Sequence, residues 1–187
     1  TIEALGAIQL AGALFANVAH GLLTGLRFFL VGGIRDRHGT SDLSRLGGGL
    51  YDRAPRLGGL LAFAAIASLG LPGLAGFWGE MLAMGGAFRP DATLSRPYFL
   101  VLMAIAGVGA VLTTLYFLVM VRRVCQPGDE PPPVKPVLLG DVTALEATAW
   151  VPLAALTVVL GLWPGLLLEL TDPAVGRIIP IRAPTSS

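Results

Sequence analysis

The sequence is poor in charged residues and nearly lacks cysteine. Only 13% of its 187 residues are charged, against about 25% in a typical soluble domain. The single cysteine, Cys125, excludes a disulfide or a cysteine-ligated iron–sulfur cluster formed within the chain. No dinucleotide-binding glycine motif, phosphate-binding loop or metal-ligand spacing occurs. A net charge of +1 gives no sign of nucleic-acid binding. The chain therefore shows no redox, nucleotide or metal chemistry of its own.

Apolar residues dominate instead, making up 54% of the chain, with a mean hydropathy of +0.73. These values predict an integral membrane protein. Four apolar stretches exceed the roughly 20 helical residues needed to cross a bilayer. They cover about 5–34, 57–88, 98–121 and 147–170. We therefore expect an all-α integral membrane protein with four transmembrane helices in one domain, 1–187, and an external tail at 171–187.

Basic residues between the spans predict the orientation. Eight of them fall in the loops 35–56 and 122–146, and four fall on the other side. The positive-inside rule then places both loops in the cytoplasm and both termini outside. Twelve of the thirteen basic residues are arginine, which indicates a GC-rich bacterial gene and hence a bacterial plasma membrane.

A polar stripe runs along the first span. Its members are Asn17, His20, Thr24 and Arg27, which cover roughly 80° of a helix at 100° per residue. Such a stripe must face protein or water rather than lipid. His20 lies at mid-span, where we expect a proton relay; the alternative is a hydrogen-bonded packing histidine. Arg27 keeps its charge, so it either snorkels and forms an ion pair or sets the field at His20 and Glu80.

The second span contains the sequence GLPGLAGFWGE at 70–80. Pro72 lacks an N–H group, and Gly73 and its neighbouring glycines loosen the backbone, so we expect a helix break near 70–76. Broken helices within a membrane commonly mark ion sites. At Glu80, burial favours the neutral acid, whereas the half-helix dipole favours the carboxylate. This balance predicts a switchable proton carrier, and the alternative is a carboxylate fixed in an ion pair.

Several long motifs resemble a known family. AHGLLTGLRFFLVG (19–32), DRHGTSDLSRLGGGL (36–50), SLGLPGLAGFWGEMLAMGGAF (68–88), LYFLVMVRRV (115–124) and GLWPGLLLELTDPAV (161–175) are similar to the proton-pumping antiporter-like subunits of respiratory complex I, NADH:quinone oxidoreductase. Multisubunit cation/proton antiporters share this fold. Glu80 follows FWG, where most relatives carry lysine, so the resemblance points to the subfamily called chain M.

The resemblance implies a fourteen-helix fold with two inverted five-helix repeats, each containing a discontinuous helix. These residues would be its last four spans, so we expect a fragment that begins mid-subunit at Thr1. By this resemblance, His20 matches a histidine of the family's hydrophilic axis, and Glu80 matches its terminal charged residue. Arg27 departs from the family, which has an apolar residue there.

As for function, the resemblance implies proton translocation coupled to electron transfer on other subunits. Flavin and iron–sulfur clusters are expected on those partner subunits, and no cofactor or metal in this chain. The expected partners are other membrane subunits of complex I, including sister antiporter-like chains, together with lipids and no nucleic acid. Two alternatives stay open: a subunit of a cation/proton antiporter without a redox partner, and a structural membrane module. Gene neighbourhood would separate the first from complex I.

Overall fold

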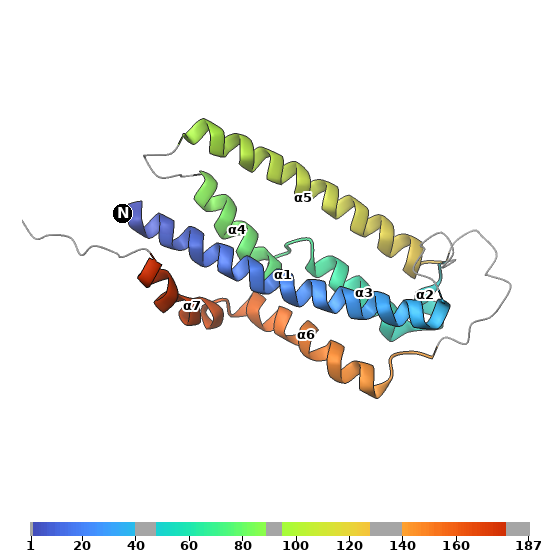
Figure 1. Ribbon diagram of the computed structural model, residues 1–187. Helices are drawn as coiled ribbons and strands as arrows, with labels where there is room; N and C mark the ends of the chain where they lie inside the picture. Colours follow the sequence, from blue (N-terminus) through green and yellow to red (C-terminus); the bar gives the residue numbers. More distant parts are fainter. Residues whose placement is uncertain (1, 40–47, 89–94, 128–139, 179–187) are drawn as a thin grey trace, which may run out of the picture.

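A computed structural model describes residues 2–39, 48–88, 95–127 and 140–178. These residues form helices and no strand beyond an isolated bridge between Gly48 and Pro127. The helices are α1 (Ile2–His38), α2 (Leu50–Arg53), α3 (Pro55–Ala67), α4 (Ala75–Phe88), α5 (Arg96–Cys125), α6 (Ala144–Leu162) and α7 (Gly165–Ile178). Figure 1 shows α1 in the middle of the bundle, with α5 and α6 on opposite sides of it.

Three of the four apolar stretches contain a helix long enough to cross a membrane, and the second is divided into two shorter helices. Three candidate spans lie within the described residues, namely Leu10–Arg37, Arg96–Cys125 and Ala144–Leu162, and Pro55–Ala67 is a shorter apolar helix. Long apolar helices satisfy every internal backbone hydrogen bond, which is what a bilayer requires. The predicted all-helical membrane fold is confirmed.

The second predicted span is discontinuous, with α3 and α4 as its two halves. The Ser68 hydroxyl donates to Ala64 O at 2.7 Å as α3 ends. Gly70 and Gly73 then adopt positive φ angles of 64° and 91°, which side chains with a Cβ rarely tolerate. Pro72 lies between them and supplies no backbone donor. The non-helical stretch therefore has a local chemical cause.

The last predicted span, 147–170, differs from the structure because it contains a second break. The helix α6 ends at Leu162 and α7 begins at Gly165. Trp163 leaves the helical conformation, with φ −125° and ψ 69°. A residue that precedes proline is disfavoured in the α region, and Pro164 follows it. Residues 171–178, predicted as tail, belong to α7.

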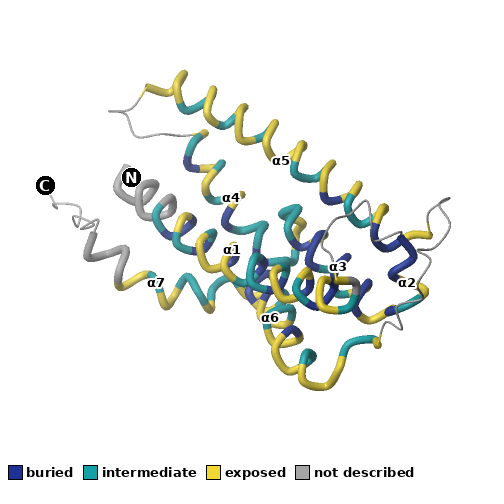
Figure 2. The backbone as a smooth tube through the Cα atoms, turned by 45° about the vertical axis from the view of Figure 1, so that its right-hand side comes forward, coloured by how far each residue is buried: buried dark blue, intermediate teal, exposed yellow. Residues whose placement is uncertain are grey.

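Small residues bring α1 and α4 into close contact. A Cβ added to Gly79 would lie 2.7 Å from Ala16 Cα, and one added to Gly12 would lie 2.6 Å from Leu82 Cβ. Figure 2 shows buried residues along α1, α3 and α2, whereas most of α5 is exposed. The bundle thus has a packed centre around α1 and an outlying α5.

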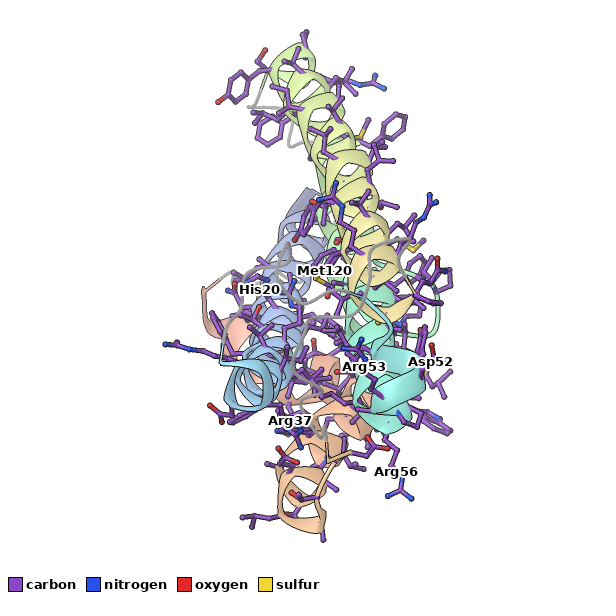
Figure 3. All side chains as sticks on the ribbon, turned by 90° about the vertical axis from the view of Figure 1, so that its right-hand side faces the viewer. His20, Arg37, Asp52, Arg53, Arg56 and Met120 are labelled. Carbon is purple, nitrogen blue, oxygen red and sulfur yellow. The ribbon has the colours of Figure 1, made fainter. Side chains whose placement is uncertain are left out.

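A polar cluster ties α1 to α6 at the end of the bundle where α6 begins. Arg37 donates to Glu146 Oε1 at 2.8 Å and to Glu146 Oε2 at 2.7 Å. It also donates to the carbonyl oxygens of Gly33, Gly140 and Asp141. In Figure 3, Arg37 lies between the ribbons of α1 and α6. Glu146, in turn, forms a capping box with Thr143.

Candidate functional site

A cavity of about 560 Å³ lies between α1, α4 and α5. Apolar residues such as Leu23 and Phe117 form part of its wall. The lining residues that carry a polar side-chain group are Asn17, His20, Arg27, Ser68, Glu80, Thr113 and Tyr116. The structure thus brings three of the four stripe residues of α1 and the glutamate of α4 to one cavity, although they lie about 60 residues apart in the sequence. Thr24 does not line the cavity.

Three members of the polar stripe of α1, His20, Thr24 and Arg27, form a hydrogen-bonded chain. Thr24 Oγ1 lies 3.2 Å from His20 Nε2, and it accepts a hydrogen bond from Arg27 Nη2 at 2.9 Å. Arg27 Nε also donates to Leu23 O at 3.3 Å. The Arg27 guanidinium lies 5.1 Å from the centre of the Phe117 ring on α5, within the range of a cation–π contact. Thr24 therefore connects the imidazole to the arginine.

Arg27 has these neutral partners and no carboxylate within salt-bridge distance among the described residues. Its cation is thus held on the cavity wall by a hydroxyl, a carbonyl and an aromatic face. An arginine keeps its charge under all physiological conditions. It therefore contributes a fixed positive charge to the cavity that also contains Glu80.

Glu80 lies in the second turn of α4, just after the helix break. Its carboxylate packs against Gly70, and a Cβ at that glycine would overlap the carboxylate oxygen. Within the described part of the chain, the carboxylate has no hydrogen bond and no ion pair. Glycine at position 70 thus serves both the positive φ of the break and the space for Glu80. The carboxylate is open to the cavity.

Pro72 and Gly73 do not line this cavity. They shape the break, which packs against the end of α6. A Cβ at Gly161 would overlap Gly73 O and Leu74 Cα, so the backbone of α6 lies in direct contact with the backbone of the helix break. Trp78 Nε1 donates to Gly161 O at 2.7 Å and fixes the start of α4 against α6. These residues therefore position Glu80 and do not contact its carboxylate.

A second cavity, of about 280 Å³, lies between α4 and α5. It shares Ser68, Glu80 and Thr113 with the first cavity. Ser68 and Thr113 were not predicted from the sequence, because their only signal there is a hydroxyl group within an apolar run. Among the described residues, no group of three or more histidine, cysteine or acidic residues could hold a metal ion.

Comparisons with known proteins show the family of the chain and its fold. The family described as NADH:quinone oxidoreductase/Mrp antiporter, TM, matches residues 2–113. NADH-quinone oxidoreductase subunit M of Rhodobacter capsulatus is 33% identical over 168 residues, which are 90% of this chain and 31% of that protein. NADH-quinone oxidoreductase subunit M of Pseudomonas aeruginosa is 35% identical over 167 residues, covering 88% of this chain and 30% of that protein. The chain thus spans about a third of the length of these relatives.

A solved structure shares the fold. Respiratory complex I from Thermus thermophilus with bound NADH includes a chain that matches with a TM-score of 0.72 and 25% identity. The match covers 95% of this chain and 37% of that chain. A family match over more than half of the sequence and a shared helical arrangement lead to the same conclusion. The chain belongs to the antiporter-like membrane subunits of the NADH:quinone oxidoreductase/Mrp antiporter family.

Proposed function

We propose that the chain carries part of a proton path across the membrane as an antiporter-like subunit of NADH:quinone oxidoreductase, coupled to electron transfer on other subunits. One observation carries this proposal. Glu80, without a partner among the described residues, lines the same cavity as His20 at a helix break. A carboxylate and an imidazole that share a space are groups able to accept and release protons.

The arrangement of each group supports this role. Glu80 has no ion pair in the described structure that would hold it ionised, so its charge can respond to the surroundings. His20 Nε2 contacts a hydroxyl rather than a carboxylate. The remaining polar members of the stripe, Asn17 and Thr24, and the charge of Arg27 then support proton movement between the two groups. A break such as that at Pro72 and Gly73 commonly accompanies an ion site within a membrane.

The proposal assigns no redox centre to this chain. Flavin and iron–sulfur clusters belong to partner subunits, and the energy of electron transfer reaches this chain as a change in charge or conformation. The partners are other membrane subunits of complex I, including sister antiporter-like chains, and lipids. The protein is placed in the bacterial plasma membrane as a multi-pass subunit of chain M type. The loops 35–56 and 122–146 face the cytoplasm, and the termini lie outside.

A cation/proton antiporter subunit is the second candidate, because the matching family includes both kinds of protein. The complex I subunit is favoured because relatives that match over most of this chain are quinone oxidoreductase chains. A purely structural membrane module is the third. In that case, replacing His20 and Glu80 would change the yield of the assembled complex and leave the protons moved per electron unchanged.

The deciding experiment is Glu80→Gln in the full protein within its native membrane. Gln keeps the size of the side chain and removes the titrating group. We expect assembly to survive while NADH oxidation and the proton gradient both fall by about tenfold or more, because a positioned proton-transfer group contributes about 10²–10⁴-fold. Native gel electrophoresis, NADH oxidation and gradient-dependent dye quenching would be recorded on the same vesicles.

The matched control is Glu169→Gln, an exposed glutamate on α7 outside both cavities. It should leave oxidation and gradient unchanged. An assembled Glu80→Gln complex that oxidises NADH and builds its gradient at the normal rate would refute the proposed role. A gradient driven by sodium or potassium exchange without NADH would favour the antiporter.

A further inference from the structure

The two cavities meet at three polar side chains. Ser68 from the end of α3, Glu80 from α4 and Thr113 from α5 line both. Beyond this junction, the first cavity extends to the polar stripe of α1. The second extends the other way, along Ala83 and Met84 of α4. Glu80 therefore lies between two separate spaces rather than at the end of one.

The second cavity continues toward the start of α5. Its residues on that helix, Ala106 and Ala110, lie closer to the first residue, Arg96, than does Thr113. In Figure 1, the start of α5 and the last residues of α4 lie at the same end of the bundle. The junction thus separates a cavity around the α1 stripe from a cavity that leads toward this end.

The two hydroxyls at the junction differ in their hydrogen bonds. The Ser68 hydroxyl donates to Ala64 O at 2.7 Å, so its proton is already used. Thr113 Oγ1 has no hydrogen bond within the described part of the chain. Its neighbour Thr114, by contrast, donates to Ala110 O at 2.9 Å. A hydroxyl has one donor and two acceptor sites, and all of these are free at Thr113.

Whether the second cavity holds water depends on the polar residues at the junction. Apart from the three shared residues, the lining is apolar, with small alanines and Met84. The volume of about 280 Å³ has room for several water molecules, since each occupies about 30 Å³ in the liquid. Apolar cavities stay dry unless polar groups hold the water. Glu80 and Thr113 are the groups that can do so from opposite helices.

We propose that Thr113 is a proton-relay residue that connects Glu80 to the second cavity, an inference that rests on the proposed function. Thr113 Oγ1 accepts the proton from the Glu80 carboxyl group while its own hydroxyl proton passes to a water molecule in that cavity. The O–H bond of the Glu80 carboxyl group breaks, one O–H bond forms and one breaks at Thr113 Oγ1, and a third O–H bond forms on the water. Thr113 remains neutral, Glu80 becomes a carboxylate and the water becomes hydronium, so one proton moves and no electron is transferred.

The test compares two substitutions at one position in the full protein, assembled in native membrane vesicles. Thr113→Val keeps the shape and removes the hydroxyl, whereas Thr113→Ser keeps the hydroxyl. We expect Val to lower the rate of gradient formation and NADH oxidation by about tenfold, because water replaces a positioned proton-transfer group only in part. Ser should restore at least half of the rate. Thr114→Val is the matched control and should pump normally, because its hydroxyl is bonded to its own helix.

A second pair of variants tests the cavity rather than the hydroxyl. Ala110→Leu would fill part of the second cavity, and Ala104→Leu adds the same volume at an exposed position of α5 outside both cavities. We expect the first to slow gradient formation by about tenfold, as for Thr113→Val, since the same transfer is blocked. The second should have no effect. Native gels would establish that each complex assembles.

Each outcome decides the inference. If Thr113→Val pumps like Thr114→Val while Glu80→Gln does not pump, the relay is refuted and the proposed function stands. If Val and Ser lose the rate equally, the shape of the side chain rather than its hydroxyl is needed, and the relay is refuted as well. If Glu80→Gln itself pumps normally, both proposals fail. Loss in Val, recovery in Ser and normal pumping in Thr114→Val support the relay.

Discussion

Arg37 offers the sharpest test of how the bundle is held together. Its guanidinium forms two parallel bonds to the Glu146 carboxylate, at 2.7 and 2.8 Å, and three more to backbone carbonyls of α1 and of the segment before α6. The two side chains are only 13% and 25% exposed. The substitution Arg37→Met keeps much of the apolar stem and removes every one of these bonds.

The geometry sets the size of the effect. Removing one partner of a buried ion pair costs about 3–5 kcal/mol, and the partial exposure of Glu146 moves the value to the lower end. We therefore expect the start of α6 to open about 3 kcal/mol more easily. Since about 1.4 kcal/mol corresponds to a factor of ten in an equilibrium constant, the equilibrium constant for local opening should rise roughly a hundredfold.

Hydrogen–deuterium exchange of the full protein, followed by mass spectrometry, measures this opening directly. Peptides that cover the first turn of α6 contain the amide of Ala147, which donates to Thr143 O. Their exchange should accelerate about a hundredfold in Arg37→Met, whereas peptides from the middle of α5 should not change. The start of α6 is the region to follow because Glu146 also caps it.

A second arginine at the same end provides the control. Arg56 approaches Asp141 at 4.0 Å, but its side chain is 78% exposed. Exposed pairs contribute about 0–1 kcal/mol, so Arg56→Met should accelerate exchange by less than about fivefold. Equal effects of the two substitutions, or no effect of Arg37→Met, would refute the view that burial and bidentate geometry make the Arg37–Glu146 pair strong.

Two further predictions concern backbone contacts. Gly161→Ala should destabilise the protein by about 1–3 kcal/mol in a thermal unfolding assay, because a Cβ there would overlap the backbone at Gly73. The control is Gly107→Ala, at a site with open space, which should be neutral or stabilising in the same assay. At Asp141, burial raises the pKa, but three backbone N–H bonds and the Arg56 charge outweigh it, so the carboxyl pKa lies below its ordinary 3.8. The Asp141 carboxylate therefore stabilises the fold fully at pH values above 3.8, and this stabilisation is lost as the pH falls further. Asp141→Asn should remove this contribution to the pH dependence of stability. An acid unfolding transition that is the same in the variant would contradict the prediction.

The local elements of the fold follow from the sequence because their causes are local. Apolar runs of sufficient length predict membrane helices, and Pro72 with its flanking glycines predicts the break of the second span. The break after Leu162 has the same kind of cause in Pro164. It was missed because hydropathy over a long window registers apolar character and not the missing backbone donor.

The candidate site was predictable in part. The spacing of Asn17, His20, Thr24 and Arg27 fixes a common helix face, since side-chain direction repeats with the helical period. That Glu80 shares a cavity with this face depends on how α4 packs against α1. Close approach at Gly12 and Gly79 determines that packing, and the sequence shows the glycines without their partners.

The sequence by itself determined the membrane character of the chain, its helix break and its polar stripe, because each depends on residues within a few turns of one another. Only the tertiary structure decided that Arg37 binds Glu146, 109 residues away, and that Thr113 joins Glu80 between two cavities. Such contacts depend on the packing of whole helices, which is determined by side chains interlocking across the bundle. The pattern within any one helix does not contain this information.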